Sequence, residues 1–288
     1  MRGGGPTNPR LPDFIVIGAA KCGTTTLDSW LSRHPDVFMA RNEPGYFASK
    51  FDLGLDWYTS QFAGARPDEL VGETTPRYTR LSDAEVAASR MVALLPDVKL
   101  IFIVRHPIDR LVSDYRHLRR LARIDQPFLD VVTTPGNQIV GASCYHGRLK
   151  PYIAAFPREN FCVVRFEDVV TDDAIGWFRV LDHLGLSHCP PPGDARNVTA
   201  DQPQVSPTMV RISELRRRLH LPRLPGWART VRRKLSKVSQ RPFVDPFADG
   251  VPPLPASVER EIWDDVERLE AWLGVDAPLW ERDARTSP

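Results

Sequence analysis

The feature that most constrains this chain is the stretch from Phe14 to Arg33, which reads FIVIGAAKCGTTTLDSWLSR. Its first four residues form a continuous apolar, β-rich run, which is typical of a strand buried on both faces. From Leu27 onward the apolar residues follow helical spacing. A buried strand that passes through a short turn into a helix is the repeating unit of α/β folds with a parallel sheet.

The turn inside this stretch combines several features that favour an anion. Small residues, including Gly18 and Gly23, let backbone N–H groups approach a ligand, and Lys21 adds a full positive charge. Thr24, Thr25 and Thr26 supply hydroxyls where the helix begins, so the positive end of the helix dipole faces the turn. The stretch therefore predicts a loop that binds phosphate or sulfate. The alternative is an ordinary strand–turn–helix with a solvated lysine, which the coincidence of these features disfavours.

The loop differs from the common ATP-binding loop in the position of its lysine. In G-x-x-x-x-G-K-[ST] the lysine follows the second glycine, whereas Lys21 precedes Gly23 by two residues. This displacement argues against an ATP-dependent kinase or NTPase. That class stays open as an alternative, as does a non-catalytic module that binds nucleotides or polyanions.

Composition points to a soluble globular protein. The 288 residues are 42% hydrophobic and 26% charged, and no run of about 18 apolar residues occurs. The N-terminus lacks the apolar core of a signal peptide, so we expect a cytoplasmic protein, and the content of Arg, Ala and Pro favours a bacterial one. The four cysteines stand singly and the seven histidines lack paired ligand spacing, so neither a disulfide framework nor a metal site is expected.

Further strand–helix units follow the first. Strands are expected at Val37–Met39, Leu70–Gly72, Lys99–Val104 and Phe161–Val164. Helices are expected after Ser82 with capping-box spacing to Glu85, from Pro107, over Gly141–Phe156, from about Asp172 to Leu184, and over Ser257–Gly274. This alternation predicts an α/β fold: a P-loop-like, three-layer α/β/α arrangement around a mostly parallel central sheet.

The chain is expected to form one domain. Residues 1–12 are Gly/Pro-rich and predicted to be disordered, and 13–288 form the domain. A basic insertion is expected at about 205–250, a proline-rich linker at Asp245–Pro255 and the C-terminal helix at about 257–274. Between Arg211 and Arg241 there are eleven Lys/Arg and one acid, while the remainder of the chain is net acidic.

Three motifs in order give the chain a family resemblance. They are Lys21-Cys22-Gly23-Thr24-Thr25-Thr26, Val104-Arg105-His106-Pro107 and Ser113-Asp114-Tyr115. Together they resemble sulfotransferases that use 3′-phosphoadenosine 5′-phosphosulfate (PAPS), most closely the heparan-sulfate and carbohydrate branch and its bacterial relatives. The resemblance covers most of residues 13–190 and 255–282.

The resemblance implies a role for each matching residue. Lys21 and the loop Cys22, Gly23, Thr24, Thr25 and Thr26 would hold the 5′-phosphosulfate, and Lys21 would stabilise the leaving group. Arg105 and Ser113 would hold the 3′-phosphate, and Tyr145 could contact the nucleotide, although an aromatic residue on a helix is more often part of the core. PAPS is then the co-substrate, and no metal is required.

Two glutamates are candidates for the proton acceptor. Glu43 lies where this branch carries its general base, although a structural carboxylate is the alternative and nearby Lys21 and Arg41 are expected to depress its pKa. Glu73 matches the glutamate of a Glu-Lys-Thr-Pro motif and is either supporting or structural. Thr74 replaces the lysine of that motif, which argues against borrowing a heparan-like acceptor.

For several other residues a structural role is expected. His106 is expected to be a neutral histidine at a helix start, Cys22 a small packing residue, and Arg165-Phe166-Glu167-Asp168 an ion-pair and turn element. The basic segment 211–241 is either a solvated insertion, a lid for an anionic acceptor or a patch that contacts anionic membrane. Nucleic-acid binding is a further possibility for this segment, which the absence of a recognition motif disfavours, so no nucleic-acid partner is expected.

The sequence thus predicts a sulfotransferase that moves a sulfuryl group to a hydroxyl, with an amine as the less favoured alternative. The acceptor would be a small molecule such as a secondary metabolite, a carbohydrate or a lipid-linked molecule such as a glycolipid.

Overall fold

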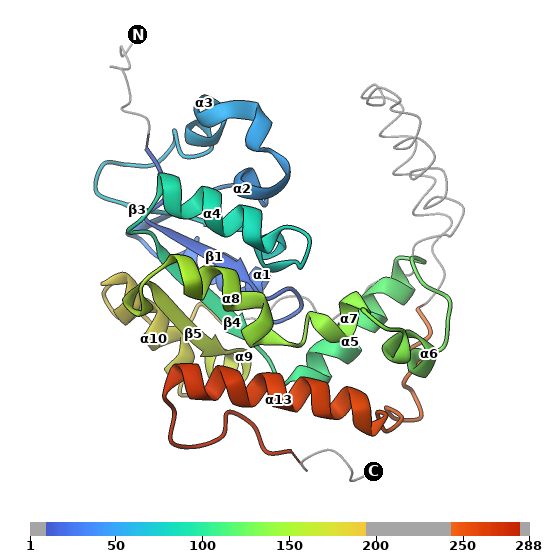
Figure 1. Ribbon diagram of the computed structural model, residues 1–288. Coiled ribbons are helices and arrows are strands. Elements are labelled where there is room, and N and C mark those ends of the chain that lie inside the picture. The colour runs from blue at the N-terminus through green and yellow to red at the C-terminus, as the bar shows by residue number, and fades with distance from the viewer. Residues whose placement is uncertain (1–9, 194–242, 283–288) are drawn as a thin grey trace.

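The computed structural model describes residues 10–193 and 243–282 (Figure 1). Its centre is a parallel sheet with strand order β2-β3-β1-β4-β5. The strands are β1 (Phe14–Gly18), β2 (Val37–Met39), β3 (Leu70–Thr74), β4 (Lys99–Val104) and β5 (Phe161–Arg165). The α/β class expected from the alternating pattern is confirmed, and each expected strand is present.

The central strand β1 is buried along its whole length because it pairs with β3 on one side and β4 on the other. Phe14 lies opposite Gly72 in this register. A Cβ atom at Gly72 would lie 2.2 Å from the Phe14 ring, so the ring occupies the space that a side chain would need. The absence of that side chain lets the apolar start of β1 pack tightly against β3.

Helices cover both faces of the sheet. Figure 1 shows α4 and α8 in front of it, whereas α1 and α10 meet on the other face through the Trp30 and Trp177 rings, whose centroids are 5.7 Å apart. The elements between the first strands are α1 (Thr24–Leu31), α2 (Tyr46–Ser49), η1 (Phe51–Leu53), α3 (Gly54–Ser60), η2 (Pro76–Thr79) and α4 (Ala84–Leu94). Later elements are α5 (Pro107–Arg120), α6 (Phe128–Thr133), α7 (Gln138–Gly141), α8 (Tyr145–Ala155), η3 (Arg158–Asn160), α9 (Phe166–Val170), α10 (Ile175–Leu184) and α13 (Ala256–Leu273).

A second apolar cluster joins α5, α6 and the segment that precedes α13. The rings of Tyr115, Phe128 and Phe247 contact one another at centroid distances of 5.0 to 5.5 Å. The segment Asp245–Pro255 has no helix or strand, as expected of a linker, but it is packed against the rest of the molecule. Phe247 is buried, and both carboxylate oxygens of Asp245 accept hydrogen bonds of 2.8 Å from Arg116. The apolar and charged residues between the prolines anchor this segment to α5.

The helix expected over Gly141–Phe156 is present but shorter, as α8 (Tyr145–Ala155), because a break separates it from the short helix α7. At the break Ser143 is fully buried and its hydroxyl donates to the carbonyl of Pro107 at 2.9 Å. The same hydroxyl accepts a hydrogen bond of 2.9 Å from Arg110 Nε. This tertiary pairing with α5 stabilises the interruption, which helical periodicity could not reveal.

The capping box expected at Ser82 is not formed. Helix α4 begins at Ala84 with Asp83 as its N-cap residue, and no side chain caps it. The Asp83 carboxylate instead accepts a 2.7 Å hydrogen bond from Arg77 Nε. Helix α10 begins at Ile175, three residues later than expected, and ends at Gly185 in the left-handed conformation.

Several expectations concern residues outside the described part of the chain. They include the disorder of 1–9, most of the basic insertion at 205–250 and the basic segment 211–241. Arg10, within the segment expected to be disordered, donates hydrogen bonds to the carbonyls of Arg66 and Glu69 at 2.7 and 2.8 Å.

Candidate functional site

The parallel sheet brings the polar turns together at one edge, because the carboxyl ends of all its strands point the same way. The turn after β1 is tied to both neighbouring strands at this edge. Ala19 N donates to the Ile103 carbonyl of β4 at 2.8 Å, and Thr75 N, directly after β3, donates to the Val16 carbonyl at 3.0 Å. The phosphate-type loop, the Glu43 turn, the Glu73 strand end and Arg105 therefore share one end of the molecule.

The loop after β1 has the backbone of a ligand-binding turn. Lys21 has φ 72°, a left-handed conformation that is uncommon for a residue with a side chain. Residues in this conformation are enriched at functional sites. Gly23 follows with φ 92° as the N-cap of α1 and provides no capping side chain. A glycine N-cap leaves the start of α1 without a side-chain cap, which suits an anion at the positive end of the helix.

Lys21 lies among several other cations. Burial lowers its pKa, Asp114 raises it, and Arg120, Arg110 and Arg105 lower it further. Three guanidinium groups close enough to disfavour the lysine charge create a strongly positive environment around the loop. Such an environment is costly unless a polyanion shares it.

Arg110 of α5 supports the loop from behind. Its side chain is fully buried, and Nη2 donates to Asp114 Oδ2 at 3.0 Å and to the Ile139 carbonyl at 2.7 Å. Its Nη1 reaches the Ala20 carbonyl at 3.5 Å. The Asp114 carboxylate compensates the charge of Arg110 only. Lys21, Arg105 and Arg120 therefore still give the loop a net positive charge.

Phe166 joins the loop to Arg105. A Cβ atom at Gly23 would lie 2.2 Å from the Phe166 ring, so the ring packs directly against the loop backbone. The Arg105 guanidinium lies 5.5 Å from the centroid of the same ring. Arg105 directly follows β4, and Ser113 lies in the second turn of α5; both side chains are partly exposed. These two residues predicted for the 3′-phosphate are thus on adjoining elements beside the loop.

Tyr145 is a supporting residue. It is fully buried, and its hydroxyl donates to the Arg105 carbonyl at 2.7 Å and accepts from the Arg105 N–H at 3.3 Å. The same oxygen lies 3.5 Å from Cys22 Sγ. This favours the core alternative over direct nucleotide contact, because the hydroxyl joins the loop after β1 to the turn after β4. Cys22 is fully buried and burial raises its pKa to about 11, which agrees with a packing residue.

Glu43 is exposed at the same edge of the sheet, in the turn between β2 and α2. Partial burial raises the pKa of its carboxyl; Arg80 lowers it, Asp28 raises it and Lys50 lowers it. The expectation that Lys21 and Arg41 depress this pKa is therefore wrong. The tertiary structure brings the charges of Asp28 and Arg80 near Glu43, and no local sequence pattern indicates either neighbour. A solvent-accessible carboxylate with a raised pKa is a better proton acceptor than a free glutamate.

Glu73 is fully buried beneath this turn. Its Oε1 accepts hydrogen bonds from Tyr58 Oη at 3.1 Å and Tyr78 Oη at 2.8 Å, while Oε2 has no hydrogen-bond partner. Burial raises the pKa of Glu73 to about 7, against the lowering effect of the two tyrosines. Tyr78 Oη also accepts from the Phe47 N–H at 3.3 Å. Glu73 thereby connects β3 to α2, the helix that follows the Glu43 turn, which supports a positioning role.

His106 packs rather than facing the loop. Its ring contacts Trp263 and Trp280 edge-on at centroid distances of 5.7 and 6.1 Å. Its backbone N–H donates to Glu167 Oε1 at 2.8 Å. The ion pair expected in Arg165-Phe166-Glu167-Asp168 is present, with Arg165 Nε donating to Asp168 Oδ2 at 2.9 Å. Beyond that expectation, the motif supplies Phe166 to the loop and Glu167 to the start of α5.

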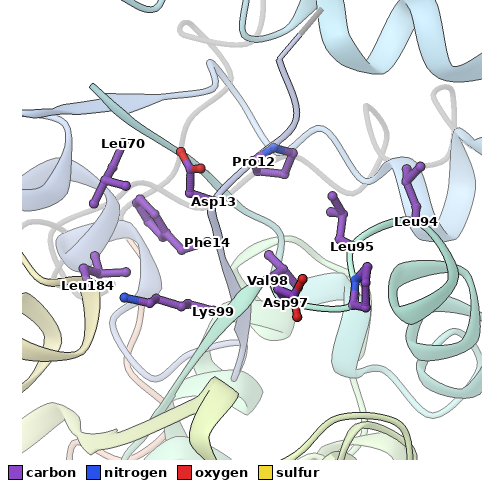
Figure 2. A pocket seen from close by; sticks show the side chains of 11 residues that line it. Pro12, Asp13, Phe14, Leu70, Leu94, Leu95, Asp97, Val98, Lys99 and Leu184 are labelled. Atoms are coloured by element: carbon purple, nitrogen blue, oxygen red, sulfur yellow. The ribbon is translucent and has the colours of Figure 1, made fainter. Parts of the chain in front are cut away.

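A cavity at the sheet, among the described residues, lies away from this site. Figure 2 shows it beside Pro12, Phe14, Leu95 and Lys99, with a volume of about 450 Å³. These residues precede or begin strands, so the cavity is at the amino end of the sheet, opposite the phosphate-type loop. None of the cationic residues around Lys21 lines this cavity.

Comparison with known proteins decides the family. A family model of the sulfotransferase domain matches residues 11–197, which is more than half of the chain. The chain belongs to the sulfotransferase family.

Its sequence identity to known sulfotransferases is low. Human heparan sulfate glucosamine 3-O-sulfotransferase 6 is 33% identical over 193 residues, covering 63% of this chain and 54% of the relative. Mouse heparan sulfate glucosamine 3-O-sulfotransferase 3B1 is 31% identical over 191 residues, covering 63% of this chain and 48% of the relative. The chain thus spans about half the length of these curated relatives. A sulfotransferase from Alicyclobacillus acidocaldarius shares the fold, with a TM-score of 0.62, 23% identity and coverage of 93% of this chain and 98% of that one.

Sequence reasoning missed several residues of this sulfotransferase site. Arg110 and Arg120 on α5 both influence Lys21, and His117 on the same helix has its pKa lowered to about 4, by burial first and by Lys21 second. Positions 110, 114 and 117 follow helical spacing, which was the available signal. Asp28 and Phe166 had no such signal, since their roles depend on contacts with distant turns.

Two searches of the described residues were negative. Within 10–193 and 243–282 no group of three or more His, Cys, Asp or Glu side chains is arranged to hold a metal ion. No helix in these ranges is both long and apolar enough to cross a membrane.

Proposed function

We propose that this sulfotransferase transfers a sulfuryl group from PAPS to a hydroxyl of a carbohydrate or of a small or lipid-linked acceptor. The observation that carries the proposal is the convergence of Lys21, Arg105, Arg110 and Arg120 around an uncapped helix start. The donor carries a 5′-phosphosulfate and a 3′-phosphate, which is the kind of polyanion that such a cluster would stabilise.

Lys21 and the amides of Gly23 to Thr26 would bind the phosphosulfate, and Arg105 with Ser113 would bind the 3′-phosphate. The bound donor supplies the sulfuryl group, whose S–O bond to phosphate breaks as the bond to the acceptor oxygen forms. Lys21 would offset the charge that develops on the departing phosphate oxygen. Catalysis would depend mainly on positioning and on preorganised charge.

Glu43 would take the proton of the acceptor hydroxyl. Its solvent-accessible carboxyl lies at the same edge of the sheet as Lys21, and its raised pKa suits a general base. Glu73 would hold the Glu43 turn and α2 in place through Tyr78 instead of accepting the proton. The relatives are named for heparan sulfate. In this chain Thr74 stands at the lysine position of the Glu-Lys-Thr-Pro motif, which argues against the same acceptor.

Calorimetry with adenosine 3′,5′-bisphosphate (PAP) and ATP, each with and without Mg²⁺, tests this proposal. We expect tight binding of PAP that does not depend on Mg²⁺. A preference for Mg²⁺-ATP would instead support the kinase or NTPase alternative and overturn the proposal.

A further inference from the structure

Phe166 lies between the two turns that would bind the ends of the donor. Strand β5 pairs with β4 so that Arg165 lies opposite Val104. The next residues, Phe166 and Arg105, therefore emerge side by side at the carboxyl edge of the sheet. The carbon of the Arg105 guanidinium lies 5.5 Å from the centroid of the Phe166 ring. A guanidinium within about 6 Å of a ring centroid is attracted by the ring's negative face, so Phe166 holds Arg105 beside it.

The same ring packs against the N-cap residue of α1. A Cβ atom at Gly23 would lie 2.2 Å from Cδ2 of Phe166 and 2.4 Å from its Cε2. Phe166 is half-buried, with one edge against the phosphate-type loop and its face toward Arg105. The ring therefore sets the spacing between the start of α1 and the guanidinium.

The Arg105 guanidinium has no competing partner in the described part of the chain. Within residues 10–193 and 243–282 the hydrogen bonds of Arg105 are made by its backbone, whose N–H donates to Tyr145 Oη at 3.3 Å and whose carbonyl accepts from it at 2.7 Å. A long side chain that binds an anion loses rotamer freedom, and this loss weakens binding. Contact with a fixed ring removes part of that freedom in advance, so it favours the binding of an anion.

Neighbouring contacts keep Phe166 itself in place. Arg165 Nε donates to Asp168 Oδ2 at 2.9 Å across the turn that begins α9. Glu167 Oε1 accepts a hydrogen bond of 2.8 Å from the His106 N–H, which joins this turn to the start of α5. The backbone around the ring is thus fixed to its surroundings, and the ring is a stable surface for the guanidinium.

We propose that Phe166 is a positioning residue for nucleotide discrimination, which holds the Arg105 guanidinium where a 3′-phosphate lies when the 5′ end of the nucleotide occupies the Lys21 loop. This inference rests on the proposed use of PAPS and adds the residue that sets the distance between its two anion sites. Phe166 acts through Arg105 and needs no contact with the phosphate. Loss of the ring should therefore weaken ligands with a 3′-phosphate more than ligands without it.

The test is calorimetry on the full chain with PAP and with adenosine 5′-phosphate, which lacks the 3′-phosphate. The ratio of the two dissociation constants measures discrimination and cancels any change at the 5′ loop that both ligands share. Phe166→Leu keeps apolar bulk beside Gly23 and removes the aromatic face. We expect it to lower the ratio by about 5-fold or more, which is the effect of losing one partly desolvated cation–π contact. Retained binding of adenosine 5′-phosphate shows that the variant is folded.

A double-mutant cycle shows whether Phe166 acts through Arg105. Arg105→Ala removes the cation, so the ring has no guanidinium left to position. Phe166→Leu in the Arg105→Ala background should therefore change the ratio by less than about 2-fold. A ring with a purely structural role would instead have the same effect in both backgrounds.

Two further variants make the result specific. Phe166→Tyr keeps an aromatic face and should keep the ratio within about 2-fold of the wild type. Phe178→Leu is the matched control, because Phe178 is also half-buried but stacks on His188, with the ring centroids 4.8 Å apart. It should change each affinity by less than about 2-fold.

Three results would overturn the inference while the wild type still prefers PAP. They are an unchanged ratio in Phe166→Leu, the same effect of Phe166→Leu with and without Arg105, and an equal fall of the ratio in Phe178→Leu. An unchanged ratio with weaker binding of both ligands would assign the ring to the 5′ loop or to the nucleoside. A wild type that does not prefer PAP to adenosine 5′-phosphate would overturn the use of PAPS itself, and the role of Phe166 with it.

Discussion

Replacement of Glu73 by glutamine should make the protein more stable at neutral and higher pH. The structure raises the pKa of Glu73 from 4.5 to about 7. Each pKa unit corresponds to about 1.4 kcal/mol, so burying the ionised carboxylate costs roughly 3 kcal/mol above pH 7. Because the folded-state pKa is raised, the wild type has its full stability below about pH 4.5 and loses this amount as pH rises through 7.

Glutamine has nearly the same shape, and its oxygen can accept the hydrogen bonds of Tyr58 and Tyr78 without carrying a charge. The free energy of unfolding of Glu73→Gln should therefore lack the decline between pH 4.5 and 7 that this carboxyl produces. Urea denaturation of both proteins, followed by tryptophan fluorescence at half-unit steps from pH 5 to 8, measures the difference. The exposed Glu85→Gln on α4 is the matched control and should follow the wild type.

Parallel stability curves for wild type and Glu73→Gln across this range would refute the assignment of a raised pKa to Glu73. Turnover gives a second readout with a PAPS-dependent assay. A positioning residue whose hydrogen bonds are conserved should retain much of its kcat. Loss of turnover in Glu73→Gln with donor binding intact would instead make Glu73 the general base.

Three other substitutions test the site. Glu43→Gln should lower kcat by about 100-fold or more without weakening PAP binding, and turnover near the wild-type level would exclude Glu43 as the base. Wild-type activity should rise with pH through a pKa above 4.5, the usual value for glutamate, since the base must be ionised. Arg105→Ala should bring the affinity for PAP close to that for adenosine 5′-phosphate in calorimetry, because the 3′-phosphate loses its cation; retained discrimination would show that another residue binds that group. Gly23→Ala should weaken PAP binding by about 10-fold or more, because the added methyl group meets the Phe166 ring, and unchanged affinity would mean that the loop can move freely.

Much of the fold could be predicted from the sequence because the patterns that indicate its strands and helices are local. The run at Lys99–Val104 predicts a buried strand from composition alone, and β4 has these bounds. Helix boundaries that depend on contacts with distant residues could not be predicted from the sequence. The expected helix starts at Tyr145 instead of Gly141, because Ser143 bonds to α5 just before it. Asp83 is unavailable as a capping side chain because Arg77 binds it.

The candidate site divides in the same way. Lys21 and Arg105 could be found because each lies within three residues of the end of a strand, and parallel strands bring such positions to one edge. Phe166 could not be found as part of the loop's surroundings, since its contact with Gly23 joins residues far apart in the chain.

The sequence by itself determined the strand–loop–helix unit, the displaced lysine and the order of the anion-binding motifs, because these depend on neighbouring residues and on strand ends. The tertiary structure alone decided the protonation behaviour of the carboxylates. Glu43 and Glu73 have raised pKa values because other parts of the chain exclude water from them and place charges beside them. Desolvation and long-range charge are properties of the packed molecule, and a linear pattern does not contain them.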